Sequence, residues 1–339
     1  MNILVDYHHG ALLTSLYKLF VERLGWTMYI PMGIDWYDKE YWSIEDGVKT
    51  DIHYEMAKQY LLSPTIPNFT IKTPEQPKIE YAYLSDVDAG LKFDIVLTSV
   101  PCRYQSFEKF VHDFGMNSKL IFQAGNNFYH GSPFIANVKN LLSSATGPYH
   151  LMTQTPNKVF YHQEFDLGLF RPEACNVNTI TNFQHFMCKP DLFHGLEVTM
   201  PNWRFRSFGG GNRESALNSI SVLAAWMRKS GFVWHVKTID EGYGHTIHNA
   251  FACGKPLITD TQYMTVYQQG KIPNTCMSLY TPDTIIDIKN MSREDIRAEL
   301  LRRADNYQYY SDKVYAKFKE VVDFDKEFVE VKAFLERLI

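Results

Sequence analysis

A turn with two glycines, set between two apolar runs, constrains the fold more than any other part of this sequence. The run 232–239 is typical of a buried strand, and Glu241, Gly242 and Gly244 follow shortly after it. Residues 245–252 favour a short helix, and a Gly-Lys-Pro turn at 254–256 leads into a second apolar run. An open parallel α/β sheet uses this order to present a helix N-terminus to an anionic ligand. The segment therefore predicts both an α/β fold and an anion-binding site.

The rest of the chain extends this pattern into two domains. A length of 339 residues exceeds one ordinary core and fits two moderate ones. The opening order of strand, helix and strand predicts a βαβ unit and a parallel sheet. The predicted strands are 2–7, 27–31, 93–100, 119–123, 178–187 and 203–208, and the predicted helices are 12–24, 105–114, 215–227, 284–322 and 325–339. We expect domains at 1–170 and 171–322 and a final helix at 323–339, with 33–83 as an elaborated surface connection.

Composition excludes several classes of protein. An apolar content of 45% and a charged content of 21% are typical of soluble globular proteins, and no apolar run reaches the roughly 18 residues of a membrane helix. The N-terminus lacks a basic segment, so it predicts a strand and not a signal peptide. Five dispersed cysteines predict reduced thiols in a cytoplasmic setting. The formal charge of −4 provides no global attraction to nucleic acid.

The residue types of the glycine turn predict how a ligand would be held. Gly242 and Gly244 permit positive φ and a close backbone approach, and a helix that begins near His245 would direct N–H groups at a phosphate. Glu241 would accept hydrogen bonds from hydroxyl groups, and Asn249 lies about two helical turns further on. The alternative is a plain turn with a solvated glutamate.

This segment resembles the donor-binding motif of GT-B-fold glycosyltransferases, in which Glu-Gly-Phe-Gly precedes a helix with a second Glu and an Ala-x-Gly-x-Pro-Val-Ile strand entry. The resemblance implies two Rossmann-like domains facing a cleft, a last helix that crosses back to the N-terminal domain, and a nucleotide-sugar donor, for which we predict a UDP-sugar. It implies that Glu241 contacts the donor sugar. Asn249 stands where the second Glu holds the ribose, and a neutral amide binds a diol more weakly. The implied donor-binding residues of this segment are Gly242, Tyr243, Gly244, His245, Thr246 and Asn249.

A second candidate site is the glycine-rich stretch after the predicted strand 203–208. Three glycines that open a helix would suit a phosphate, with a guanidinium clamp on a diphosphate. The frame Phe-Arg-Ser … Arg-Glu-Ser also resembles a diphosphate-binding segment of phage DNA β-glucosyltransferases. The donor-binding candidates here are Arg206, Gly209, Gly210, Gly211 and Arg213, and the alternative is a flexible loop with surface arginines.

The sequence predicts a metal-independent reaction without a cofactor. Nothing in it resembles an Asp-x-Asp metal site, and His245 and His248 lack an evident third ligand. Cationic side chains, backbone donors and helix N-termini can stabilise a leaving diphosphate instead.

Candidates in the N-terminal half follow the first two strands. In GT-B enzymes the first such loop lies near acceptor and donor, so His8 or His9 would act as a base or bind the diphosphate together with Gly10. Asp35 is a further catalytic candidate after the second strand. Neighbouring acceptor-side candidates are Trp36 and Asp38, with Asn126 and Asn127 as weaker ones.

The predicted activity is transfer of a hexose or pentose from a nucleotide diphosphate to an acceptor. The acceptor stays open among a glycan, a small molecule and a modified DNA base such as a hydroxymethylated pyrimidine. The N-terminal sequence resembles viral or phage glycosyltransferase-like proteins, and a phage enzyme could modify a DNA base in a host cytoplasm, although the charge of −4 does not favour this acceptor. The alternatives are a nucleotide-sugar epimerase of the same fold and a non-catalytic nucleotide-sugar-binding module. The oligomeric state is open.

Overall fold

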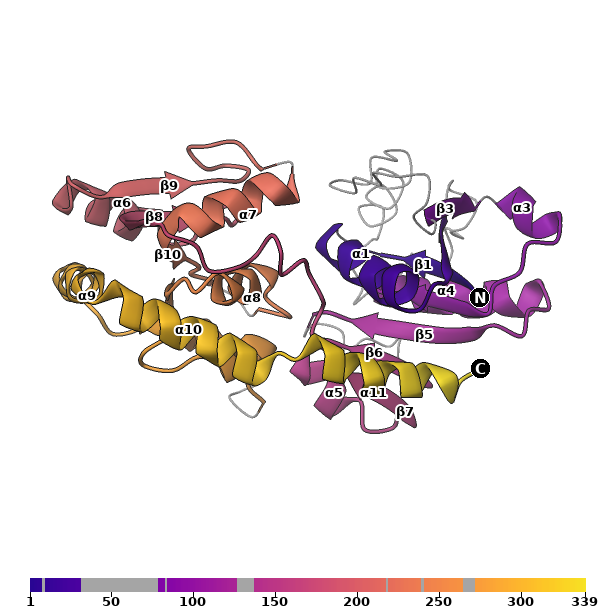
Figure 1. The fold of residues 1–339 in the computed structure, drawn as a ribbon. Helices are drawn as coiled ribbons and strands as arrows, with labels where there is room; N and C mark the ends of the chain where they lie inside the picture. Colours follow the sequence, from indigo (N-terminus) through magenta and orange to yellow (C-terminus); the bar gives the residue numbers. More distant parts are fainter. Residues whose placement is uncertain are drawn as a thin grey trace, which may run out of the picture. The chain divides into compact units, whose positions relative to one another are not determined.

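The computed structural model describes residues 1–7, 10–31, 79–82, 84–126, 137–217, 219–238, 241–264 and 272–339. The chain forms two compact units (Figure 1). Unit 1 comprises Met1–Glu164 together with Phe324–Ile339, and unit 2 comprises Phe165–Asp323. None of the described helices is long and apolar enough to cross a membrane.

Unit 1 is built on a seven-stranded sheet whose strand order is β3-β2-β1-β4-β5-β6-β7. All neighbouring strands are parallel. The strands are β1 (Asn2–Asp6), β2 (Thr27–Pro31), β3 (Ile79–Ala82), β4 (Ile95–Thr98), β5 (Lys119–Ala124), β6 (Asn140–Ser143) and β7 (Asn157–Phe160). This is a doubly wound sheet, and its order reverses between β1 and β4, which is where such sheets bind ligands.

The helices of unit 1 follow from local sequence signals. The helix predicted over 12–24 is confirmed, although its second half is a wider π-helical turn, and Gly25 ends it at a φ of +68°. Pro101 occupies the first turn of its helix, where a missing N–H costs nothing. The helices are α1 (Gly10–Tyr17), η1 (Lys18–Arg23), α3 (Leu84–Asp88), α4 (Pro101–Asp113), α5 (Thr146–Leu151) and α11 (Phe324–Glu336).

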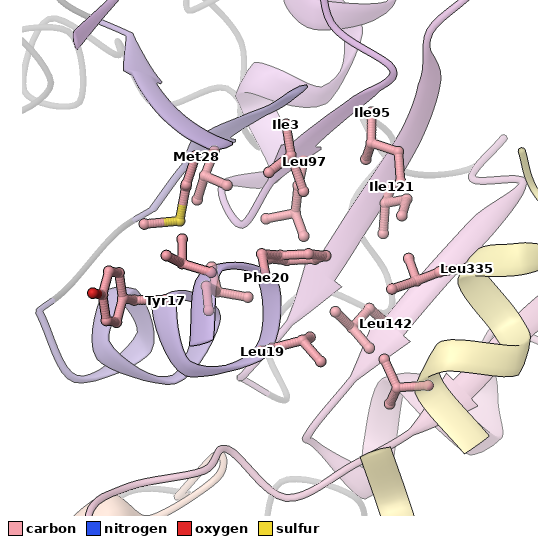
Figure 2. Close-up of a cluster of buried hydrophobic side chains, with 14 of the residues drawn as sticks. Ile3, Tyr17, Leu19, Phe20, Met28, Ile95, Leu97, Ile121, Leu142 and Leu335 are labelled. Atoms are coloured by element: carbon pink, nitrogen blue, oxygen red, sulfur yellow. The ribbon is translucent and has the colours of Figure 1, made fainter. Parts of the chain in front are cut away.

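The C-terminal helix α11 belongs to the core of unit 1. Phe334 and Leu335 are buried in the cluster that joins α1 to the sheet, and Figure 2 shows Leu335 beside Leu142 of β6. Glu327 of α11 accepts hydrogen bonds from the backbone N–H and the ring Nδ1 of His162, at 2.6 and 2.7 Å. The prediction that the last helix returns to the N-terminal part is confirmed.

Unit 2 has a five-stranded parallel sheet in the order β12-β11-β10-β8-β9. The strands are β8 (Asn176–Asn182), β9 (Arg204–Ser207), β10 (Ser230–Trp234), β11 (Leu257–Thr259) and β12 (Ile285–Asp287). The order reverses between β8 and β10, so the expected ligand crevice lies beyond the carboxyl ends of these two strands. The predicted α/β class with two Rossmann-like sheets is confirmed.

The helices of unit 2 confirm some boundaries and correct others. The predicted capping box is present, since Ser292 accepts from the backbone N–H of Asp295 and the Asp295 carboxylate accepts from that of Ser292. The stretch 284–322 is not all helical, because β12 occupies its start, and the helix predicted from 215 begins only at Ile220. The helical segments are α6 (Pro190–Thr199), α7 (Ile220–Lys229), α8 (His245–Ala252), η6 (Thr261–Met264), η7 (Thr275–Leu279), α9 (Arg293–Asp305) and α10 (Tyr307–Val321).

Candidate functional site

The predicted glycine turn lies at the point where the strand order of unit 2 reverses. Strand β10 ends at Trp234, the chain reaches Glu241 seven residues later in the numbering, and α8 begins at His245. Because β8 and β10 are paired in parallel, the loop after β8 emerges at the same edge. The sequence thus brings a carboxylate and a helix N-terminus to the place where doubly wound sheets bind ligands.

Gly244 shapes the N-terminus of α8. Its φ of +78° lies in the left-handed region, and a Cβ there would lie 3.1 Å from Cδ1 of Ile247. The Gly244 carbonyl accepts hydrogen bonds from the backbone N–H groups of Ile247 and His248, at 3.0 and 3.1 Å, and these bonds close the first turn of α8. The earlier N–H groups of a helix have no intrahelical acceptor, and with the helix dipole they favour an anion.

Glu241 is held as a carboxylate by two basic neighbours. Nε2 of His235 lies 2.8 Å from Oε2 of Glu241, and Nζ of Lys237 lies 3.3 Å from the same oxygen. Burial raises the pKa of Glu241, but the hydrogen bond from His235 and the positive charges of His235 and Lys237 outweigh it and lower the pKa to about 2. Burial lowers the pKa of His235, although its contact with Glu241 acts in the opposite direction. Glu241 is therefore ionised at neutral pH.

Some side chains after Glu241 pack within the protein, and others are partly exposed. Tyr243 is buried and stacks on the ring of His248 at 4.1 Å, so its ring supports the first turn of α8. Nδ1 of His248 donates to the Gly244 carbonyl at 3.0 Å. His245 and Thr246 are partly exposed in the same turn. Asn249 is buried, and its Oδ1 accepts no hydrogen bond from the described residues.

The glycine-rich loop after β9 is engaged within the protein. It does not open a helix, since α7 starts at Ile220. The N–H of Gly209 donates to the Glu214 carbonyl at 3.2 Å, and the N–H of Gly210 donates to Nδ1 of His185 at 2.7 Å. Gly211, with a φ of +77°, allows Phe186 to pack closely. The expected phosphate cradle at the start of a helix is therefore not formed there.

The two arginines of this stretch are each paired with a glutamate. Arg206 lies 3.2 Å from Glu214, and Arg213 forms a two-point contact with Glu197 at 2.8 and 2.7 Å. Arg206 also lines a pocket that none of the residues 241–249 borders. Among the described residues, neither arginine contacts Glu241 and each is paired with another glutamate, so neither is assigned a donor-binding role.

A charged pair that the sequence did not reveal lies at the same edge as Glu241. Lys189 follows β8 and Asp260 follows β11, and Nζ and Oδ2 lie 2.6 Å apart. Lys189 has a φ of +54°, which is rare for a side-chain-bearing residue and is enriched at functional sites. Asp260 directly follows the apolar run after the Gly-Lys-Pro turn, and a polar residue at the end of a predicted strand was the one sequence signal that could have identified it as a site residue.

Unit 1 also gathers polar groups where its strand order reverses. Asp6, the last residue of β1, forms a buried ion pair with Arg103 of α4 and accepts a 2.7 Å hydrogen bond from Thr98 at the end of β4. Gly10 is the first residue of α1. Asn126 follows β5 and is partly exposed. The predicted residues His8, His9, Asp35, Trp36, Asp38 and Asn127 lie outside the described residues.

The described part of the chain contains no cluster of three or more His, Cys, Asp or Glu side chains that fits a metal ion. Metal independence stays a prediction.

Comparison with known proteins places the fold among glycosyltransferase structures. No protein-family model and no curated protein sequence matches the chain. Among solved structures, Anabaena HepE in complex with UDP and glucose matches with a TM-score of 0.64 at 10% identity, over 99% of each chain. Sucrose-phosphate synthase from Thermosynechococcus elongatus has a TM-score of 0.63 at 9% identity, over 99% of this chain and 98% of its own.

A third similar structure is an α-glucosyltransferase in complex with UDP and a 13-mer DNA that contains an HMU base. It matches with a TM-score of 0.57 at 10% identity, over 99% of each chain. These likenesses confirm the two-sheet α/β fold predicted from the sequence, and they extend over the whole chain and not only over the glycine turn.

Proposed function

We propose that this protein is a glycosyltransferase that takes a sugar from a nucleotide diphosphate, with a UDP-sugar as the donor. The observation that carries the proposal is the placement of the ionised Glu241 beside the N-terminus of α8, where the sheet of unit 2 reverses its order. Similar structures that contain UDP, and in one case glucose, support it.

Each part of the site has a role in this reaction. Glu241 accepts hydrogen bonds from hydroxyl groups of the donor sugar, because an ionised carboxylate is a strong acceptor. The first turn of α8 stabilises the charge that develops on the leaving diphosphate. Asn249 hydrogen-bonds the ribose. We propose that neither a metal nor a cofactor takes part, and that His8, His9, Gly10 and Asp35 serve the acceptor and the donor phosphates.

We expect UDP and its sugars to bind the folded protein and raise its melting temperature. A ligand that binds only the folded state stabilises it by about 2.7 kcal/mol at about 100 times its Kd. A thermal-shift screen of nucleotide sugars measures this, with uridine as a control that lacks the diphosphate. If no nucleotide sugar shifts the melting temperature more than uridine does, the proposed donor is wrong.

The acceptor is the next question, and a DNA base is the candidate with specific support. One similar structure holds DNA with an HMU base, whereas the formal charge of −4 is unfavourable to DNA. Incubation of UDP-glucose with hydroxymethylated DNA, unmodified DNA or a glycan, followed by mass spectrometry of each acceptor, distinguishes the classes. A change of the donor sugar's stereochemistry without any acceptor would instead indicate an epimerase.

The contact between His235 and Glu241 predicts a pH dependence. A lowered pKa keeps Glu241 ionised down to about pH 2, so acid does not weaken donor binding in the range where proteins are usually assayed. In His235→Leu the donated hydrogen bond is lost, the pKa of Glu241 rises, and UDP-glucose binding is lost at a higher pH. Titration of the Kd against pH measures this shift.

His235→Gln is the matched control, because its amide can still donate to Glu241. We expect this variant to lose UDP-glucose binding at a pH close to that at which the unaltered protein loses it. If the Leu and Gln variants lose UDP-glucose binding at the same pH, the hydrogen bond does not control the ionisation of Glu241.

A further inference from the structure

Unit 2 contains a pocket that borders the amino ends of β8 and β10. It has a volume of about 440 Å³, which is within the size range of small-molecule sites, and it is lined by Cys175, Asn176, Arg204, Arg206, Trp226 and Lys229, among others. Asn176 and Ser230 are the first residues of β8 and β10, and they are paired in register. Glu241 comes seven residues after Trp234, the last residue of β10, and the five residues of β10 span about 13 Å. Asn176 and Ser230 therefore lie at the opposite end of this strand from Glu241, whereas Arg206 is level with Val233 near its carboxyl end.

The lining of this pocket is cationic. Arg204 and Lys229 form no ion pair with the residues that the structure describes, whereas Arg206 forms an ion pair with Glu214 at 3.2 Å. The carboxyl end of α7 also borders the pocket, and its dipole contributes about half a negative charge. The positive charges of Arg204 and Lys229 together exceed the partial negative charge at the end of α7, so the pocket attracts an anion.

The wall that carries α7 is fixed in place. The hydroxyl of Ser230 donates to the Trp226 carbonyl at 2.8 Å and lies 2.6 Å from the hydroxyl of Thr181 on β8. The indole of Trp226 packs against Phe208 at 5.0 Å between ring centres, and the Arg206 guanidinium lies 5.8 Å from it. A rigid apolar wall beside unshared cations suits a ligand with an anionic end and an organic body.

We propose that this pocket binds a small organic phosphate, a phosphomonoester with a ring-bearing body. The phosphate oxygens accept hydrogen bonds from Arg204 and Lys229, and the body lies against Trp226. Arginine is suited to the phosphate because its fork of N–H donors contacts two oxygens at once. The proposal is independent of the function assigned to Glu241 and the start of α8, since none of the residues 241–249 lines this pocket.

Cys175 reports whether the pocket is occupied, because it lines the pocket, is not in a disulfide and is partly exposed. The probes are 5′-AMP as a phosphomonoester, adenosine as its neutral counterpart and inorganic phosphate. UDP is left out of this measurement, because it is itself an organic phosphate with a ring-bearing body and would compete for the pocket. We expect 5′-AMP to slow alkylation of Cys175, measured by peptide mass spectrometry, while the likewise free thiol of Cys188 reacts at an unchanged rate. Adenosine should have no effect.

Variants distinguish a built site from unspecific binding. We expect Arg204→Gln to weaken 5′-AMP binding about tenfold, the usual loss for a charge-assisted hydrogen bond. Arg204→Gln combined with Lys229→Gln should abolish the protection of Cys175. Arg297→Gln, which removes an exposed arginine on α9, should bind normally. Equal protection by adenosine, an unchanged Kd in the double variant, or tighter binding of a DNA duplex than of 5′-AMP would each overturn the proposal.

Discussion

Glu241→Gln is expected to reduce kcat/KM for sugar transfer or donor hydrolysis by about 100-fold, with little change in stability. The carboxylate is proposed to accept at least one hydrogen bond from the donor sugar, and a bond to a charged group contributes about 1.5–3 kcal/mol, or about 10- to 150-fold. Glutamine keeps an oxygen that can accept from His235, and Lys237 can turn to solvent, so the fold should tolerate the change. Release of UDP from UDP-glucose measures the effect.

The matched control for this prediction is Glu320→Gln. Glu320 is an exposed glutamate of α10 that pairs with Lys317 at 2.6 Å, and an exposed pair of this kind contributes little to stability. We expect this variant to keep full activity. Full activity of Glu241→Gln together with an unchanged melting temperature would remove the basis for the proposed function.

The site around the glycine turn was predictable because its signals are local. Within about 20 residues the sequence specifies a buried strand, a residue at positive φ, a helix start and the next strand, and each depends on its neighbours in the chain. Gly244 illustrates this, since its own φ of +78° and its nearest neighbour, Cδ1 of Ile247, are the main restrictions on which residue fits. The partners of Glu241 are local as well, but the sequence does not show that His235 turns toward it.

The glycine-rich loop after β9 illustrates what local signals miss. Gly209, Gly210 and Gly211 have the composition of a phosphate loop, yet the N–H of Gly210 is taken by His185, which lies 25 residues away in the sequence. The ion pair of Asp6 with Arg103, 97 residues apart, is equally a product of the tertiary fold. Residue types show that a loop can bind an anion, whereas the partners of its N–H groups decide whether it remains able to do so.

Short strands were the other limit. Strands β6 and β7 have four residues each, and neither was predicted, because neither lies in a longer apolar run or shows clear alternation. Strand β4 is equally short but was predicted, since it lies within the apolar run 93–100. Strand β12 has three residues and lies at the start of a stretch with helical spacing, so the prediction assigned that stretch to a helix. These strands exist because parallel neighbours supply their hydrogen bonds, and this contribution is not visible in one segment of sequence.

Phe334→Ala should destabilise unit 1 by about 3–5 kcal/mol, the usual cost of truncating a buried phenylalanine. Phe334 is fully buried in the cluster shared by α1 and the sheet, although more than 150 residues of unit 2 separate α11 from the rest of unit 1 in the sequence. Hydrogen exchange should therefore rise in β5 and β6 and stay unchanged in β10 and β11. Val329→Ala, on the same helix but 64% exposed, is the control and should change stability by no more than about 0.5 kcal/mol. Equal effects of both substitutions, or faster exchange in unit 2 alone, would mean that α11 does not complete the core of unit 1.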